Sequence, residues 1–346
     1  MYTAQGIDID MIFDEYKKEN NLRIMSSKTR DNYNMCIDLF IRYIKEHELS
    51  VDKEAVLLWQ KHLLEKDRPL SKSSVIRYIT DLKTFFQWAV DSGYMDETPF
   101  KNYRSTLRKD PTNKNYLTTD EFETFLNFNV NSIRREDRTE FFINWLFMCV
   151  LLTTGVRVDS ASRIRLCDVD FEAGTIYLHK AKGDISYSVS VSDDILEKIK
   201  HYIKVLRPQS IPDEAPLFLK RIPVNMMHKF TAKNGYMKRI WRAGNGTYYA
   251  PIHERHISHR TCPKYTMDIC GKALTAHEFR HSHAMYLYEK GVPIEVISEQ
   301  LGHSSVSITQ NYLHGLQRST LKKHTQAVWD NLKQGTDVHA LQIRKA

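Results

Sequence analysis

The chain has 346 residues, 42% of them hydrophobic and 11% aromatic, which is enough for two domains that each bury a sizeable core. Its formal net charge of +8 favours an anionic partner. The five cysteines are odd in number and scattered, which argues against a disulfide framework and favours a reduced, intracellular protein. No segment predicts a signal peptide or a membrane span.

The N-terminal third predicts a small helical bundle. Residues 1–20 form a polar lead-in with one possible helix, and residues 21–108 follow as the bundle. Apolar residues at helical spacing predict one helix capped by Ser26 or Ser27, one over residues 51–64, and one from Ser71 or Ser73 to Gly93. Short loops join these helices. Basic residues on the loops and polar faces are candidate DNA contacts, with ordinary solvated charge as the alternative: Lys28, Arg30, Lys72, Arg77, Lys83 and Arg104.

The basic, polar stretch 101–115 predicts an interdomain linker, with the domain boundaries drawn at 109 and 116. A second domain over 117–320 then begins with a helix capped by Thr118 or Thr119. The strongly apolar run 141–154 predicts a central core helix that ends at Gly155, two residues before Arg157. A tail helix is expected over 321–346.

Alternating residues at 175–178 and 187–191 predict two strands of a hairpin, with Lys180 and Lys182 at its tip. From 212 to 270 we expect a helix over 224–242 and a loop rich in Gly, Tyr and His. The fold class is therefore mainly α with a small antiparallel β-sheet.

Histidines and cysteines gather in that loop and raise the possibility of zinc: His253, His256, His259, Cys262 and Cys270. Their spacing has neither a Cys-x-x-Cys pair nor a finger pattern. We therefore expect no metal, and interpret the loop as a basic, DNA-facing segment carrying Arg255 and Arg260.

The stretch 274–314 holds most of the chemistry. Thr275 and Glu278 predict a capping box at a helix start, and His277 and Arg280 lie three residues apart on one face of that start. A helix N-terminus attracts anions, so this pair suits a phosphate. Gly291 and Pro293 should end the helix. A short helix over 293–301, a turn at 302–304 and a third helix with Tyr312 should follow.

Five motifs in order, TTGVR, a basic hairpin, HEFRH, LGHSS and ITQNYL, resemble the tyrosine recombinase (phage integrase) family. The resemblance covers residues 117–314 well and the bundle only in outline. It implies a SAM-like core-binding domain ahead of the catalytic domain. It also implies six catalytic residues: Arg157, Lys182, His277, Arg280, His303 and the nucleophile Tyr312. Lys180 remains the alternative lysine, and Asp159 is the only acidic residue close behind the first arginine.

The resemblance implies a site-specific DNA recombinase that cleaves and rejoins duplex DNA through a covalent 3′-phosphotyrosyl intermediate, without ATP, cofactor or metal. The expected task is integration, excision or resolution, in the setting of a mobile element. The expected partners are double-stranded DNA with a specific recombination site and three further copies in a homotetramer. The chain should be cytoplasmic and associated with the nucleoid, and the short lead-in argues against a separate arm-site domain.

The tail after Tyr312 is amphipathic and should dock on a neighbouring copy, or else pack on its own domain; its apolar residues are Leu316, Leu321, Val328, Trp329 and Leu332. Two other functions stay open. One is a type IB topoisomerase that relaxes DNA, and the other is a DNA-binding accessory protein without catalysis.

Overall fold

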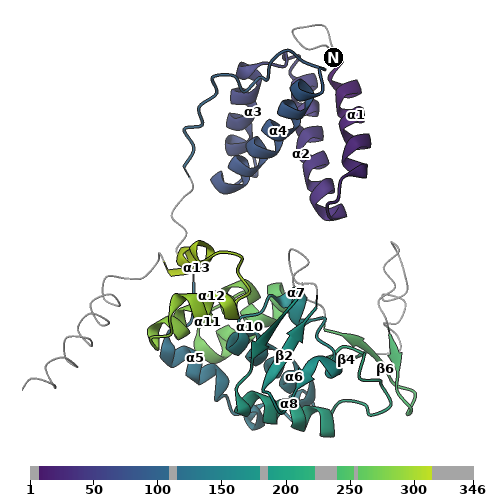
Figure 1. The fold of residues 1–346 in the computed structure, drawn as a ribbon, viewed down its shortest axis with the longest axis vertical. Helices are drawn as coiled ribbons and strands as arrows, with labels where there is room; N and C mark the ends of the chain where they lie inside the picture. Colours follow the sequence, from purple (N-terminus) through teal and green to yellow (C-terminus); the bar gives the residue numbers. More distant parts are fainter. Residues whose placement is uncertain (1–7, 109–114, 180–185, 223–239, 253–255, 314–346) are drawn as a thin grey trace, which may run out of the picture. The chain divides into compact units, whose positions relative to one another are not determined.

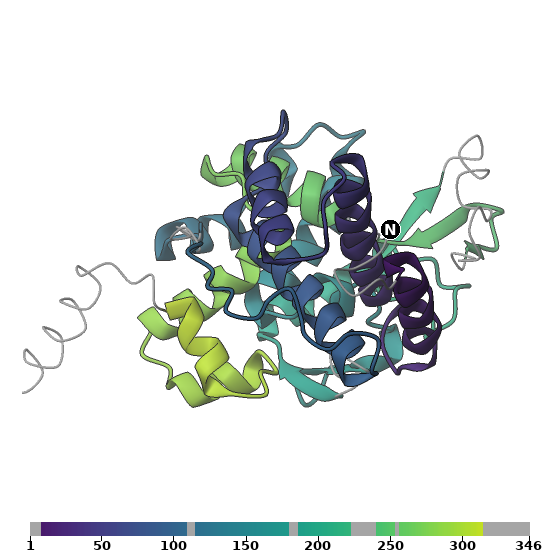
Figure 2. The same cartoon turned by 90° about the horizontal axis from the view of Figure 1, so that it is seen from above.

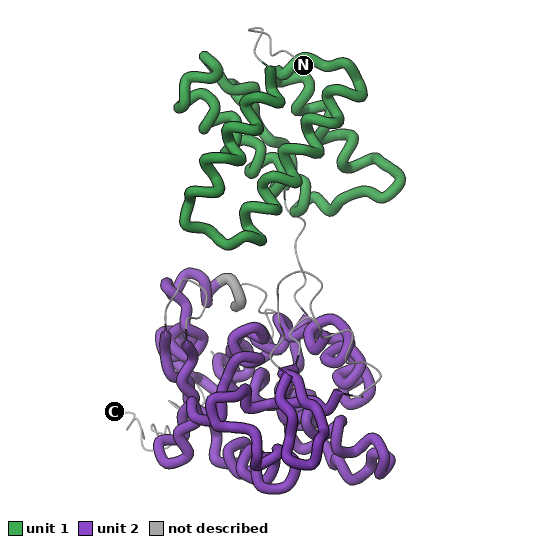
Figure 3. The backbone as a smooth tube through the Cα atoms, turned by 90° about the vertical axis from the view of Figure 1, so that its right-hand side faces the viewer, with its two compact units in different colours: residues 1–112 green, residues 113–346 purple. Residues whose placement is uncertain are grey.

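The computed structural model describes residues 8–108, 115–179, 186–222, 240–252 and 256–313, and it contains two compact units, 1–112 and 113–346 (Figures 1 and 3). The division falls inside the stretch that the sequence marks as a linker. Among the described residues, no helix is long and apolar enough to cross a bilayer.

Unit 1 is a bundle of four helices (Figure 1): α1 (Ile9–Leu22), α2 (Ser27–Glu46), α3 (Lys53–Glu65) and α4 (Lys72–Asp91). The cap residues are those that the sequence indicated for α2 and α4, because the Ser26 and Ser71 hydroxyls accept from backbone N–H groups three residues on. The core is dense in aromatic side chains, with Phe40 edge-on to Trp59 at a centroid distance of 5.2 Å.

Helix α1 confirms the possible helix of the expected lead-in, and it packs in the same core as the bundle. Ile9, Ile12 and Tyr16 are almost fully buried in the same core as α2 and α4. The Trp88 indole N–H of α4 donates to Glu19 of α1 at 2.7 Å. Residues 8–20 are polar on average, but their apolar residues recur on one helical face, and that face closes the bundle.

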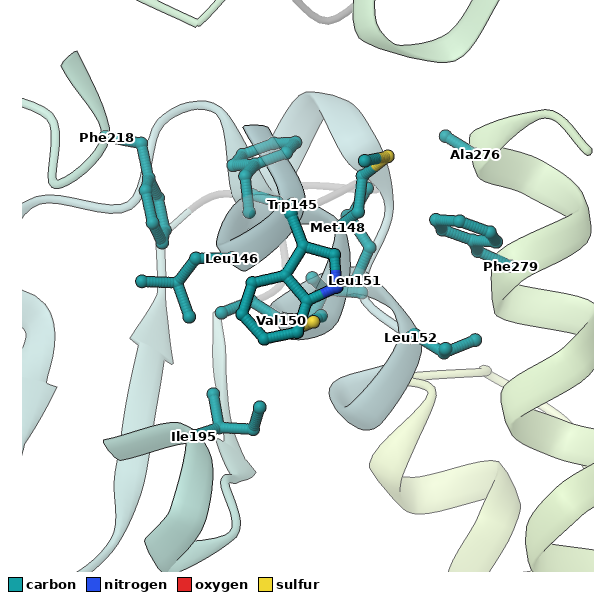
Figure 4. Packing of buried hydrophobic residues seen from close by; sticks show 14 of the residues in the cluster. Trp145, Leu146, Met148, Val150, Leu151, Leu152, Ile195, Phe218, Ala276 and Phe279 are labelled. Carbon is teal, nitrogen blue, oxygen red and sulfur yellow. The ribbon is translucent and has the colours of Figure 1, made fainter. Parts of the chain in front are cut away.

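Unit 2 contains most of the remaining elements, and its helices are α5 (Thr119–Leu126), α6 (Arg138–Thr154), α7 (Val158–Ala161), α8 (Asp193–Val205), α10 (Cys262–Cys270), α11 (Ala276–Glu289), α12 (Ile294–Gln300) and α13 (Val306–Leu313), with 3₁₀ turns at η1 (Val130–Ser132) and η2 (Leu166–Asp168) and a π-helical turn at η4 (Ile257–Thr261). The unit is organised around α6. This helix is apolar on all sides, and α11 and α8 flank it through residues such as Phe279 and Ile195 (Figure 4). The prediction of a central core helix is confirmed.

The first sheet has the order β1-β2-β3, with β1 (Val169–Asp170), β2 (Thr175–Leu178) and β3 (Tyr187–Ser190), all antiparallel. Ile176 faces Val189 in register, and both side chains are buried, as the alternating pattern predicted. The predicted hairpin strands are therefore confirmed, and the tip between them lies outside the described residues.

A second antiparallel sheet, which the sequence did not predict, has the order β4-β6-β5, with β4 (Leu219–Ile222), β5 (Trp241–Arg242) and β6 (Tyr248–Pro251). Both views show it extending from the helical part of unit 2 (Figures 1 and 2). Trp241 pairs with Tyr249 and packs in a small cluster with Leu219. The expected helix over 224–242 is thus wrong at its end, because sheet pairing there overrides local helix propensity; residues 224–239 lie outside the described residues.

The expected loop before α11 is also wrong over residues 257–270, which are helical in η4 and α10. Apolar side chains explain the difference. Cys262 is fully buried, and the Tyr265 ring stacks on Phe141 of α6 at 4.4 Å. Packing on the central helix stabilises these turns.

Candidate active site

The C-terminus of α6 places Arg157. Gly155 ends the helix with φ +65°, a left-handed conformation that favours glycine. A Cβ at this position would lie 2.5 Å from a ring carbon of His283 and 2.6 Å from Leu301. Arg157 follows after one buried valine and starts α7 in extended conformation, with its side chain partly exposed. The glycine therefore allows α11 and α12 to approach the turn that carries Arg157.

Helix α11 brings His277 and Arg280 to the same end of the helix. The Thr275 backbone N–H donates to Glu278 at 2.6 Å in a capping box, as predicted. His277 is in the first turn and exposed, whereas Arg280, one turn on, is 1% exposed. One face of a helix thus presents an exposed histidine above a buried guanidinium.

The Arg280 guanidinium is held by hydrogen bonds from three directions. It donates to the Gly155 carbonyl at 2.7 Å, to the Leu301 carbonyl at 2.8 Å, and to His303 Nε2 at 2.6 Å. These contacts join α11, the end of α6 and the turn after α12. Since guanidinium stays charged and has its N–H donors in a planar fork, these contacts fix the orientation of a permanent cation.

His303 accepts from Arg280 through Nε2, so its proton lies on Nδ1, which donates to Thr309 Oγ1 at 2.7 Å. Burial lowers the pKa of His303 to about 4, and the positive charges of Arg280 and Arg157 add to this effect. The imidazole is therefore neutral near pH 7. Arg157 lies two residues after Gly155, whose carbonyl accepts from Arg280.

Strand β3 is attached to the turn that carries His303. Gly302 has φ +60°, and a Cβ there would overlap the ring of Tyr187. The Tyr187 hydroxyl donates to the Leu301 carbonyl at 3.3 Å. The Gln300 side-chain amide donates to the Ser190 carbonyl at 3.1 Å and accepts from the Ser190 backbone N–H at 3.3 Å. Sequence reasoning missed Tyr187 and Gln300, and the glycine before His303 was the available signal for a close approach.

The end of β2 next to the hairpin tip has its own anchor. The buried Asp168 carboxylate accepts from Arg165 at 2.6 Å and lies 2.8 Å from His179 Nε2. Burial opposes ionisation, but the hydrogen bonds from Arg165 and His179 hold the pKa of Asp168 below its usual value. Asp159 pairs with Arg163 at 2.6 Å, so the acidic residue nearest to Arg157 in sequence is engaged elsewhere.

The structure therefore joins Arg280 and His303 directly, places the turn that carries Arg157 next to Arg280 through Gly155, and places His277 one turn from Arg280. Tyr312 lies in α13, three residues after Thr309, and its side chain lies outside the described residues. Lys180 and Lys182, the two candidate lysines, also lie outside them.

The predicted DNA contacts are dispersed over exposed surfaces. Lys28 and Arg30 lie in the first turn of α2, and Lys72, Arg77 and Lys83 lie along α4. The Lys83 ammonium is 5.1 Å from the centroid of the Tyr103 ring, a cation–π contact that gives it a packing role. In unit 2 Arg260 is exposed on η4, and Arg255 lies outside the described residues.

Of the five residues behind the zinc alternative, His253 lies outside the described residues. Within the described ranges, no three His, Cys, Asp or Glu residues are arranged to hold a metal ion. Burial raises the pKa of the Cys262 thiol far above its usual value, and the Cys270 thiol donates to the Glu121 carbonyl at 3.4 Å. A buried thiol of this kind resists forming the thiolate that zinc binds.

Comparisons with known proteins show the family to which the chain belongs. The phage integrase family matches residues 115–318, and the phage integrase SAM-like domain matches residues 9–105. The tyrosine recombinase XerD of Staphylococcus aureus is 27% identical over 324 residues, which cover 91% of this chain and 97% of that protein.

Two solved structures share the fold. XerH site-specific recombinase bound to palindromic difH substrate is 20% identical with a TM-score of 0.62, covering 87% of this chain and 80% of that one. The Tn1549 transposon integrase in complex with a circular intermediate DNA is 17% identical with a TM-score of 0.61, covering 93% of this chain and 100% of that one.

Proposed function

We propose a reaction for this chain from one premise: it belongs to the phage integrase family and is a tyrosine-type site-specific recombinase. The resemblance that the five sequence motifs carry is confirmed by the family match, and so is the mainly helical fold. Each step of the reaction is assigned to a side chain from one of these sequence motifs.

The Tyr312 phenolate oxygen attacks a scissile phosphodiester, a P–O bond to tyrosine forms, and the P–O bond to the 5′-oxygen breaks. The product is a 3′-phosphotyrosyl enzyme and a 5′-hydroxyl. A second 5′-hydroxyl can then attack this ester and release the tyrosine, so the phosphodiester energy is conserved. The chemistry needs neither ATP nor an external oxidant.

Arg157 and Arg280 bind the non-bridging oxygens and stabilise the charge that develops on them. One observation carries this assignment: the buried Arg280 guanidinium is fixed by hydrogen bonds to the Gly155 and Leu301 carbonyls. A donor that is already oriented needs no reorganisation when the phosphate reacts. Lys182 protonates the leaving 5′-oxygen, with Lys180 as the alternative, and His277 moves the Tyr312 proton.

His303 supports the phosphate as a hydrogen-bond donor, which requires a proton on Nε2. Without DNA that nitrogen accepts from Arg280 and the pKa is about 4. An anionic phosphate beside the ring favours the protonated form. Near pH 7, His303 therefore gains its second proton when the phosphate binds, and Nε2 then donates to the phosphate instead of accepting from Arg280.

The assembly follows from the reaction. Four copies bind two synapsed DNA sites and exchange strands between them. The tail of each copy docks on a neighbouring copy. The DNA sites belong to a mobile element. Binding to chromosomal DNA gives a nucleoid-associated protein. The DNA-bound complexes named for XerH and the Tn1549 integrase support a duplex DNA partner.

A trapping experiment tests the chemistry. A duplex is selected from a random pool with the full-length protein, mapped, and remade with a nick next to the cleavage position. Cleavage of this substrate releases a short fragment and leaves protein attached to DNA. We expect a covalent adduct with the natural chain and none with Tyr312→Phe.

The matched control is Tyr177→Phe, because Tyr177 is an exposed tyrosine on β2. It should form the adduct at the natural rate. No adduct with the natural chain on the selected duplex would contradict catalysis and favour an accessory DNA-binding protein. Relaxation of supercoils without exchange between paired sites would favour a type IB topoisomerase.

A further inference from the structure

Two buried side chains of α11, one turn apart, bind backbone carbonyls at the same end of α6. Arg280 donates to Gly155 at 2.7 Å, and the Nδ1 of His283 bonds the Leu152 carbonyl at 3.0 Å. The last four carbonyls of an α-helix have no partner within the helix, and Leu152 is among these. The Val156 N–H, which could have reached back to it, donates to Thr154 Oγ1. His283 therefore caps the C-terminus of α6 from another helix.

The chemistry of the ring fits a permanent donor. His283 is 2% exposed, and burial lowers its pKa to about 4, so the ring is neutral. A carbonyl oxygen only accepts, which fixes the proton on Nδ1. Nε2 is buried and has no hydrogen-bond partner among the described residues. His283 thus binds the backbone of α6 through Nδ1.

The ring also packs against the turn that leads to Arg157. A Cβ on Gly155 would lie 2.5 Å from the His283 ring, so ring and backbone are in direct contact. The ring therefore contacts the turn twice, through a hydrogen bond to the Leu152 carbonyl and through packing against Gly155. Two residues later the chain reaches Arg157.

We propose that His283 is a positioning residue, which fixes the turn at the end of α6 and so aims Arg157 at the scissile phosphate. The proposal rests on the function proposed above for Arg157. It differs from that function in what it predicts, because the buried His283 should act only through the arginine.

Two variants separate the donor from the volume. His283→Asn keeps an N–H donor near the place of Nδ1 and loses ring volume, whereas His283→Phe keeps the ring and loses the donor. Single-turnover adduct formation on the nicked duplex should fall roughly 10- to 100-fold in His283→Phe, because small misplacement of a catalytic group costs that much. His283→Asn should recover most of that rate. DNA affinity, measured by titration of the uncleaved duplex, should stay within about two-fold in both.

A structural control comes from the other half of α6. Tyr265→Phe removes a buried hydrogen bond with Asn144 at 3.3 Å, far from the Gly155 turn. It should lower stability without changing the adduct rate. Equal rate losses in Tyr265→Phe and His283→Phe would mean that His283 acts through general stability, and would overturn the proposal.

The link to the arginine is tested in an Arg157→Lys background. If His283 acts through Arg157, His283→Phe should change the rate there by no more than about two-fold, because coupled residues are not additive. The same proportional loss in both backgrounds would overturn the proposal and leave the proposed function intact. No adduct from the natural chain, by contrast, would reject the function itself.

Discussion

Two cationic regions of the chain, the surface of α4 in unit 1 and the surroundings of Arg280 in unit 2, hold positive charge in opposite ways. Unit 1 carries Lys72 and Arg77 on the surface of α4, in contact with solvent. Unit 2 buries Arg280 and fixes it with two backbone carbonyls and a histidine. Exposed charges give attraction that is individually weak and screened by salt, whereas a fixed, buried charge can stabilise one transition state. The first arrangement suits holding a long polyanion, and the second suits reacting at one phosphate.

The largest expected effect is the replacement of the buried charge by another cation. Arg280→Lys keeps the charge but loses the planar fork that reaches Gly155 and Leu301, and adduct formation should fall about 10²- to 10³-fold. The control is Arg163→Lys, at an exposed arginine paired with Asp159, which should stay within about two-fold. Similar losses in both would contradict the distinction between buried and exposed charge. The rate of adduct formation in both variants is measured by single-turnover kinetics.

Gly155→Ala should come next, with a stability loss of about 3 kcal/mol. The left-handed backbone costs a non-glycine residue ~1 kcal/mol, and the new Cβ meets His283 and Leu301. Gly271→Ala is a matched control, because Gly271 also ends a helix, at φ +70°, with nothing within 4 Å of its Cβ position. It should cost only ~1 kcal/mol. Urea denaturation compares the two; equal losses would show that the turn has room to relax.

Acid should destabilise unit 2 through its buried histidines. The pKa of His283 is about 4 in the folded chain, below the ordinary 6.5. Between these two pH values, the residue is protonated in the unfolded chain and neutral in the folded chain. Stability from this residue is complete above pH 6.5 and is lost as pH falls from 6.5 toward 4, by about 2 kcal/mol at pH 5. Urea midpoints at pH 7.5 and pH 5 measure the drop. It should shrink by this amount in both His283→Phe and His283→Asn, and an unchanged drop would mean that the ring is already charged.

The smallest effect should come from the surface of unit 1. Replacing Lys72 and Arg77 by Gln should weaken DNA binding several-fold and lower the slope of log affinity against log salt by about one for each phosphate that the variant no longer neutralises. The control is Arg42→Gln, an exposed arginine on α2 that pairs with Asp38. It should leave the slope unchanged. Filter or anisotropy titrations at several salt concentrations measure it, and an unchanged slope in the double variant would remove α4 from the DNA-binding surface.

Local patterns predicted what local forces determine. The caps at Ser26, Ser71 and Thr118, the glycine stop at Gly155, and the hairpin strands were all visible in the sequence, because each depends on neighbours within a few residues. The second sheet was not visible. Its strands are short, and the pairing of Leu219 with Pro251 spans a long separation in sequence.

For the candidate site, the motifs identify the residue types but not their partners. Arg280 could be named from its motif, yet its bond to Gly155 joins residues 125 apart. His283 and Tyr187 were missed because a buried histidine and a strand tyrosine have ordinary packing roles in most folds. Only the folded chain shows what each of them touches.

The bond between His303 and Thr309 leads us to expect that a single chain supplies Arg280, His303 and Tyr312 to one active site. Thr309 is fully buried in α13, and His303 of the same chain donates to it. The helix that carries Tyr312 is thus tied to the subunit that carries Arg280. Mixing inactive Tyr312→Phe subunits with inactive Arg280→Ala subunits should therefore give no complementation, because no site in the mixed assembly regains both residues.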